Sequence, residues 1–231
     1  MNGEPPDRKP APRTVLLLGA TGLVGGHALR LFAYDGRWGR VVTLDRRPLA
    51  AVSASHEPHV VDFDRLAERA DLLACDDFVC CLGTTMKRAG SRAAFRRVDL
   101  EIPAEAARLA RAQGATQALL VSALGADADS RIFYNRVKGE AEAAVRAVGF
   151  ESAGLFRPSL LTGKRDEPRF GERVAEVALR AVSPLLVGPL AALRPTPAEA
   201  VARALVAVAA ERPTGVRVYG PAEIKGQAAR A

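Results

Sequence analysis

Residues 14–25 read Thr14-Val-Leu-Leu-Leu-Gly-Ala-Thr-Gly-Leu-Val-Gly25, and this stretch decides the fold. Its uninterrupted apolar run predicts a buried strand, and three glycines spaced three apart follow where a helical pattern begins. In a dinucleotide site, Gly19 would permit the sharp turn, Gly22 would let the backbone approach a diphosphate, and Gly25 would let helix and strand pack closely. Free N–H groups at the positive end of the helix would bind the anion.

A chance glycine-rich turn is the alternative interpretation of these residues. The position after the first strand of an alternating α/β chain favours a dinucleotide site instead. This interpretation predicts that the cofactor contacts a continuous segment, namely Gly19, Ala20, Thr21, Gly22, Leu23, Val24 and Gly25.

Short apolar runs alternate with helical patterns along the rest of the chain. Strands are expected at residues 14–18, 41–44, 59–61, 78–82, 118–122, 153–156 and 216–219. Helices are expected at residues 22–34, 101–113, 132–148, 170–182 and 197–210. Apolar strands separated by amphipathic helices are typical of a parallel sheet covered on both faces. The sequence therefore predicts a doubly wound α/β (Rossmann) domain with about seven strands.

The domain organisation follows from the same pattern. One domain is expected over residues 13–220, with tails at 1–12 and 221–231 and a small substrate-covering segment at about 159–197. Gly149 is expected to end one helix, and Thr196 to cap another whose first helical residue is Pro197.

Composition narrows the classes of protein further. With 231 residues, 48% of them hydrophobic, and no long apolar run, the chain is expected to be a soluble protein without a transmembrane segment. Its net charge of +7 comes from scattered arginines, so no nucleic-acid partner is expected. Three cysteines form no disulfide framework, which indicates a reducing compartment such as the cytoplasm. The three histidines do not have the spacing of metal ligands, so no metal site is expected. Separately, the chain is expected to be a monomer or a homodimer.

Residues at the end of the second strand bear on the choice of cofactor. Asp45 stands where an acid would accept a hydrogen bond from the ribose 2′-hydroxyl of NAD(H). Arg46 and Arg47 follow, and guanidiniums pair well with the 2′-phosphate of NADP(H). We favour NADP(H), since two arginines outweigh one carboxylate that could turn away, but NAD(H) or simple solvated charges stay open. Asp62, after the third strand, would contact the adenine edge or else serve as a turn residue.

Three residues further along form a candidate catalytic group. Tyr134 and Lys138 lie one turn apart on one helix face, and Ser122 ends the fifth expected strand. A free phenol has a pKa of about 10, and a neighbouring ammonium stabilises its phenolate. A serine hydroxyl can hold a substrate carbonyl oxygen by a hydrogen bond. Each residue alone has a plain structural explanation, but together, downstream of the glycine loop, they indicate proton transfer to a carbonyl oxygen.

The arrangement resembles the short-chain dehydrogenase/reductase superfamily, in its atypical or extended branch, over roughly residues 14–210. It is similar in particular to the Tat-interacting-protein-like oxidoreductases, through Cys80-Cys-Leu-Gly-Thr-Thr85, Ala89-Gly-Ser91, Phe95-Arg-Arg-Val-Asp99, Phe133-Tyr-Asn-Arg-Val-Lys-Gly-Glu140 and Phe156-Arg-Pro-Ser159. The resemblance implies a Rossmann fold, NADP(H) binding in which Tyr134 and Lys138 take part, and a Ser–Tyr–Lys centre. It also implies that Gly83 and Thr84 lie beside the cofactor and that Pro158 and Ser159 lie near the nicotinamide. Asp99 stands where many superfamily members have an asparagine that assists proton relay.

These observations favour an NADP(H)-dependent enzyme that transfers hydride to or from a carbonyl/alcohol substrate, with Tyr134 as the acid/base. A cofactor-binding sensor or assembly protein is the alternative, because little chain is left for a substrate domain. Isomerisation of a nucleotide sugar suits the superfamily but fits poorly with so short a C-terminal region.

Overall fold

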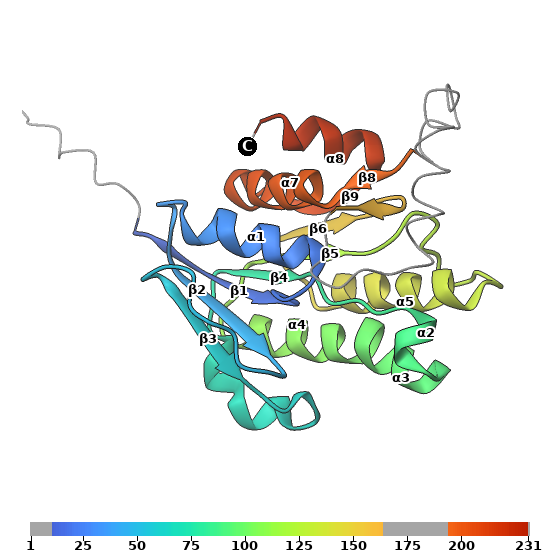
Figure 1. The fold of residues 1–231 in the computed structure, drawn as a ribbon, viewed down its shortest axis with the longest axis horizontal. Coiled ribbons are helices and arrows are strands. Elements are labelled where there is room, and N and C mark those ends of the chain that lie inside the picture. Colours follow the sequence, from blue (N-terminus) through green and yellow to red (C-terminus); the bar gives the residue numbers. More distant parts are fainter. Residues whose placement is uncertain (1–10, 164–193, 231) are drawn as a thin grey trace, which may run out of the picture.

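The computed structural model describes residues 11–163 and 194–230, and its centre is a seven-stranded parallel sheet (Figure 1). The strand order is β3-β2-β1-β4-β5-β6-β9. Successive strands are added outward on one side of β1 and then, from β4 onward, on its other side, as in a doubly wound fold. The strands are β1 (Arg13–Leu18), β2 (Trp38–Asp45), β3 (His56–Val60), β4 (Asp77–Cys80), β5 (Gln117–Val121), β6 (Ser152–Phe156) and β9 (Gly215–Tyr219). A separate pair is formed by β7 (Leu161–Thr162) and β8 (Thr196–Pro197).

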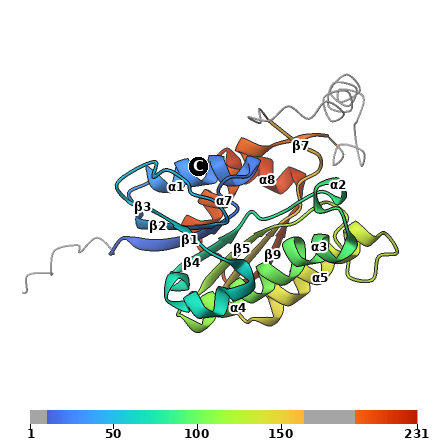
Figure 2. The ribbon, with the colours of Figure 1, turned by 60° about the horizontal axis from the view of Figure 1, so that its bottom comes forward.

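Helices cover both faces of this sheet (Figures 1 and 2). One face carries α1 (Leu23–Ala33), α7 (Ala198–Glu211) and α8 (Pro221–Ala228). The other carries the helical segments η1 (Phe63–Leu73), α4 (Ile102–Ala112) and α5 (Phe133–Ala147). The short helices α2 (Met86–Ala89) and α3 (Arg92–Arg96) lead into a π-helical turn, η2 (Arg97–Glu101), which continues as α4.

Alternation along each strand divides the core into two layers. In β1, Val15 and Leu17 pack under α1 and α7, whereas Leu16 and Leu18 pack toward α4 and η1. All four side chains are fully buried, which explains why the strand reads as a continuous apolar run. Cys80 belongs to the second layer and Cys81 packs against the first, as expected for neighbouring residues of a strand end.

The predicted architecture is confirmed, and each expected strand overlaps an observed one. Residues 1–10 and the expected helix at 170–182, with most of the expected substrate-covering segment, lie outside the described residues. Gly149 adopts the left-handed conformation (φ +77°) just after α5, as its capping role requires.

Two expectations at the C-terminal end are wrong. Residues 221–228 are not a tail but helix α8, because Pro221 starts the helix and Ile224 is fully buried against the α1–α7 layer. Thr196 does not cap α7, because it lies in β8 and hydrogen-bonds Ser159; the helix follows Pro197 without a side-chain cap.

Candidate functional site

The glycine loop has the geometry that its sequence predicts. Gly19 adopts φ +81°, which favours glycine, and the N–H of Gly22 donates to Gly19 O at 2.9 Å to close the turn. A Cβ on Gly25 would lie 2.0 Å from Gly19 O, so only glycine permits this close packing. The 11-residue helix α1 then starts with no side-chain cap and no acidic residue in its first turn. Its positive end is therefore available to an anion.

The remaining loop residues divide between surface and core. Thr21 is exposed and Leu23 is half-buried, whereas Ala20 and Val24 are buried in the layer beneath α1. Any contact of Ala20 or Val24 with a cofactor would therefore use backbone atoms.

Asp45 stays buried at the carboxyl end of β2, next to the glycine loop on β1. It is 6% exposed, and its Oδ2 has no hydrogen-bond partner among the described residues. Burial raises the pKa of this carboxyl, and the Thr43 hydroxyl only partly opposes that effect. The possibility that the Asp45 carboxylate turns away is therefore not realised in this structure, where the residue stays buried. Arg46 and Arg47 are exposed and form no ion pair with another described residue.

Of the two roles that the sequence left open for Asp62, the structure shows that of a turn residue. It is exposed, and its Oδ1 accepts a hydrogen bond from the N–H of Asp64 at 2.9 Å at the start of η1. Its side chain is thus already used in a local cap.

Ser122 follows β5 directly, in the loop beside the end of β6. Its N–H donates to Phe156 O at 2.7 Å, which fixes the backbone. Its side chain is buried, but its Oγ has no hydrogen-bond partner in residues 11–163 and 194–230. A buried hydroxyl without a partner is costly unless a ligand completes it.

Tyr134 and Lys138 lie one turn apart near the start of α5. Tyr134 is 37% exposed, and its ring packs on Phe95 with 5.6 Å between centroids. Lys138, by contrast, is only 6% exposed. The phenol is thus accessible to a substrate while the ammonium behind it is enclosed.

The buried partner of Lys138 is Asp99, from the π-helical turn η2. Lys138 Nζ lies 2.8 Å from Asp99 Oδ1, and Asp99 Oδ2 accepts a hydrogen bond from the N–H of Thr84 at 2.9 Å. Burial alone would lower the pKa of Lys138, but Asp99, Tyr134 and Cys80 together outweigh this effect and the pKa is raised. A Cβ on Gly83 would lie 3.5 Å from Asp99 Oδ1 and 3.6 Å from Lys138 Nζ. Gly83, Thr84, Asp99 and Lys138 therefore form one compact cluster.

This direct pairing was not predicted from the sequence, where Asp99 appeared only as a replacement for asparagine. One signal could have revealed it. Asp99 stands four residues after Phe95, which is fully buried, so both residues lie on the inward face of the same helical segment. A carboxylate on an inward face needs a cationic or N–H partner.

Pro158 and Ser159 follow β6 and are fixed from two sides. Pro158 O accepts a hydrogen bond from the N–H of Leu124, in the loop that follows Ser122, at 2.8 Å. The Ser159 hydroxyl lies 2.9 Å from Thr196 Oγ1 and also donates to Arg194 O. These contacts hold the end of β6 close to the loop after β5.

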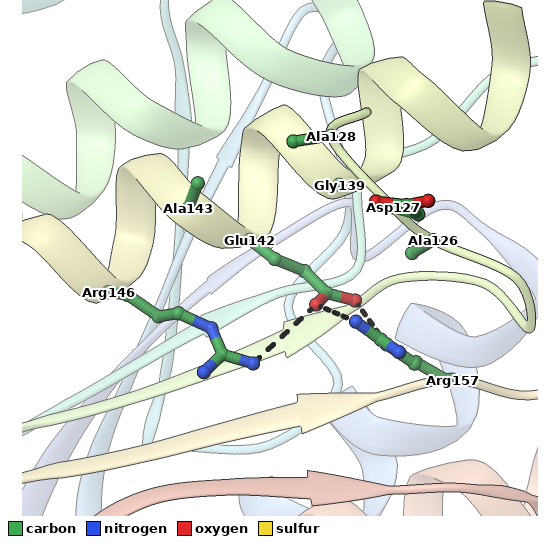
Figure 3. Close-up of a pocket in the computed structure, with 8 residues that line it drawn as sticks. All are labelled: Ala126, Asp127, Ala128, Gly139, Glu142, Ala143, Arg146 and Arg157. Carbon is green, nitrogen blue, oxygen red and sulfur yellow. Dashed lines mark hydrogen bonds and ion pairs between the residues drawn. The ribbon is translucent and has the colours of Figure 1, made fainter. Parts of the chain in front are cut away.

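A pocket of about 450 Å³ lies beside α5, between its middle and the loop of residues 126–128 (Figure 3). Glu142 projects into it and is held by the guanidinium of Arg157, with Nε 2.8 Å from Oε1 and Nη2 2.6 Å from Oε2. Arg146 lies 3.9 Å from the same carboxylate. The formal charges of Glu142 and Asp127, which also lines the pocket, offset those of Arg146 and Arg157, so these side chains give the pocket no excess positive charge for an anion.

No helix in residues 11–163 and 194–230 combines the length and apolar character needed to cross a membrane. In the same residues, no three His, Cys, Asp or Glu side chains gather as a metal site.

Comparisons with known proteins agree with this fold. A profile of the family described as "NAD dependent epimerase/dehydratase family" matches residues 15–219. Protein HTATIP2 of Rattus norvegicus is 36% identical over 173 residues, which cover 73% of this chain and 71% of that protein. The mitochondrial protein fmp52 of Emericella nidulans is 35% identical over 168 residues, covering 70% of this chain and 72% of that protein.

Solved structures give the same architecture at lower identity. MoeE5 in complex with UDP-glucose and NAD aligns with a TM-score of 0.68 at 20% identity, covering 94% of this chain and 81% of MoeE5. UDP-glucuronic acid 4-epimerase from Bacillus cereus in complex with NAD aligns with a TM-score of 0.65 at 14% identity, covering 90% and 77% respectively. At these identities the likeness concerns the fold.

Proposed function

Because the chain belongs to the NAD dependent epimerase/dehydratase family and is a homologue of HTATIP2 and Fmp52, we propose that it is an oxidoreductase acting on a carbonyl/alcohol pair. The observation that carries the proposal is the buried, ion-paired ammonium of Lys138 one turn behind the accessible phenol of Tyr134. Burying an ammonium costs free energy that a lysine at the surface avoids, so this buried position favours a functional role for Lys138.

The residues present fit a nicotinamide dinucleotide. The turn Gly19–Gly25 would hold the diphosphate, the end of β2 the adenosine ribose, and Lys138 with Gly83 and Thr84 the nicotinamide side. When bound, the cofactor supplies or accepts the hydride.

The protein's own part is to move a proton and hold the substrate oxygen. In the reductive direction, Tyr134 donates its phenolic proton to the carbonyl oxygen, and Lys138 stabilises the phenolate that remains. Ser122 donates a hydrogen bond to the same oxygen. This role is supported by its buried Oγ, which has no partner in the part of the chain that the structure describes. In the oxidative direction the phenolate takes the proton back from the alcohol.

Two features pull the choice of cofactor in opposite directions. Asp45 Oδ2, which has no partner among the described residues, supports a hydrogen bond from the 2′-hydroxyl of NAD(H). Arg46 and Arg47, which form no ion pair within those residues, support the 2′-phosphate of NADP(H). We retain NADP(H) as the proposed cofactor, because two guanidiniums act against one carboxylate. Burial also raises the pKa of that carboxyl, which lowers the cost of keeping it neutral beside a phosphate.

The surroundings of Tyr134 support an apolar substrate. Met86, Ile132 and Leu160 are 39%, 62% and 48% exposed, and they follow β4, β5 and β6 respectively. The carboxyl ends of these neighbouring parallel strands share one edge of the sheet, and the chain segments that carry the three side chains and Tyr134 all follow this edge. We therefore propose that the carbonyl group is attached to an apolar body.

The experiment is a panel of aldehydes, ketones and quinones assayed with NADPH and, separately, with NADH. Oxidation of NADPH with at least one apolar carbonyl compound is expected. Tight binding of NADPH without turnover of any compound would contradict enzyme activity and favour the sensor.

The cellular compartment is a further prediction. Cysteine usage indicates the cytoplasm, but the Fmp52 homologues carry the word mitochondrial in their names. Localisation of a tagged chain decides between these two compartments.

A further inference from the structure

Asp99 is the most completely buried acid of the candidate site. It is 1% exposed, and its two oxygens contact groups from different parts of the chain. Oδ1 binds the Lys138 ammonium on α5, while Oδ2 binds the Thr84 N–H in the loop after β4. One carboxylate thus joins the helix that carries Tyr134 to the strand end that follows β4.

The local fold holds Asp99 in this position. It lies in the π-helical turn η2. Such turns are rare in proteins as a whole, but those that occur are often found at functional sites. Arg97 anchors the turn from outside, because its guanidinium donates to Asp64 Oδ1 at 2.9 Å and to Phe63 O at 2.7 Å. The fully buried ring of Phe95 anchors it from inside.

We propose that Asp99 is a positioning residue for proton transfer: it fixes the ammonium of Lys138 relative to Tyr134 and, through the N–H of Thr84, relative to the cofactor loop. This inference rests on the proposed function and assigns a role to a carboxylate where an asparagine relay was the expected device. The negative charge also helps to keep the enclosed ammonium of Lys138 protonated.

The consequence concerns the alkaline side of the pH profile. The groups that act on Lys138 are Asp99 from η2, Tyr134 from its own helix and Cys80 from β4, and only Asp99 is a carboxylate. Without the Asp99 charge, the buried ammonium of Lys138 loses its proton more readily. The reductive rate should therefore fall at lower pH, since it needs a charged lysine beside Tyr134.

Two variants separate charge from hydrogen bonding. Asp99→Asn keeps the volume and an acceptor for Thr84 but removes the charge, whereas Asp99→Leu removes both. We expect Asp99→Asn to bind NADPH within about threefold of the wild-type affinity, and to lose half of its reductive rate about one pH unit lower. We expect Asp99→Leu to weaken NADPH binding about tenfold or more.

Asp77→Asn is the matched control. Asp77 is also fully buried and ion-paired, 3.2 Å from Arg13, but it starts β4 at the opposite edge of the sheet. The variant Asp77→Asn should leave the pH profile of the reductive rate and the NADPH affinity unchanged. A wild-type pH profile in Asp99→Asn would overturn the inference, as would an equal shift in Asp77→Asn.

NADPH affinity, followed by fluorescence, keeps the test independent of turnover. If the wild-type chain binds NADPH but reduces nothing, the proposed function fails while Asp99 can still be judged. The affinity of Asp99→Asn should then decline at lower pH than that of the wild type, because Lys138 loses its charge earlier. Identical pH dependence of binding would overturn the role of Asp99 as well.

Discussion

Arg157 binds both carboxylate oxygens of Glu142, at 2.8 and 2.6 Å, and so ties the end of β6 to the middle of α5. Glu142 lies one turn beyond Lys138 and two turns beyond Tyr134, on the same stripe of that helix. The stripe is therefore fixed by two ion pairs, Lys138 with Asp99 and Glu142 with Arg157.

Glu142→Gln should destabilise the fold, because it removes a buried carboxylate and leaves Arg157 without its partner. Since Arg157 is partly exposed and can be rehydrated, we expect a loss of about 1–3 kcal/mol in the free energy of unfolding, measured in urea. Glu199→Gln is the control, because its pair with Arg203 is exposed and should contribute under about 0.5 kcal/mol. Equal losses in the two variants would contradict the role given to burial.

Gly25→Ala should damage the glycine loop, since the new Cβ would lie 2.0 Å from Gly19 O. We expect NADPH affinity to fall about tenfold or more, together with a lower melting temperature. Gly36→Ala serves as the control, because a Cβ there meets nothing within 4 Å. Full NADPH affinity in Gly25→Ala would show that the loop does not hold the diphosphate.

Cofactor preference should respond in opposite directions to changes at the end of β2. Asp45→Ser is expected to raise the preference for NADPH over NADH about tenfold, because it removes the carboxylate near the phosphate. Replacing both Arg46 and Arg47 by alanine should lower that preference by a similar factor. The ratio of the two dissociation constants measures both effects, and an unchanged ratio in both variants would remove this strand end from cofactor recognition.

The three cysteines should resist alkylation in the native protein. Burial raises the pKa of Cys75 and of Cys80 to about 12, and it raises that of Cys81 well above its usual value. Only the thiolate reacts, so modification by iodoacetamide should stay slow from pH 7 to 9 in the native state and become fast in urea. Rapid labelling of the native protein would contradict this burial.

The fold could be predicted because its strands are apolar on both faces. Leu16 and Leu17 point to opposite layers and both are fully buried, so the strand is visible without knowledge of its neighbours. Helix α8 was missed because Ile224 is its one buried residue, which leaves no apolar periodicity to detect. Its place depends on packing against α7, a contact between segments and not a local pattern.

The candidate site was only partly predictable for a similar physical reason. Ser122, Tyr134 and Lys138 were found because spacing and strand ends are local features of the sequence. The pairs Lys138 with Asp99 and Arg157 with Glu142 join residues far apart in the chain, and 28 arginines offer many partners for any acid. Only the strand order decides which of these charges meet.

Reduction of an apolar carbonyl compound by NADPH, compared between the wild type and Tyr134→Phe, tests the central claim most directly. Tyr34→Phe is the control, since that hydroxyl donates to Val52 O away from the site. If Tyr134 donates the proton, Tyr134→Phe should lose at least about 100-fold in turnover while its NADPH affinity stays within about threefold. Wild-type turnover in Tyr134→Phe would contradict the mechanism.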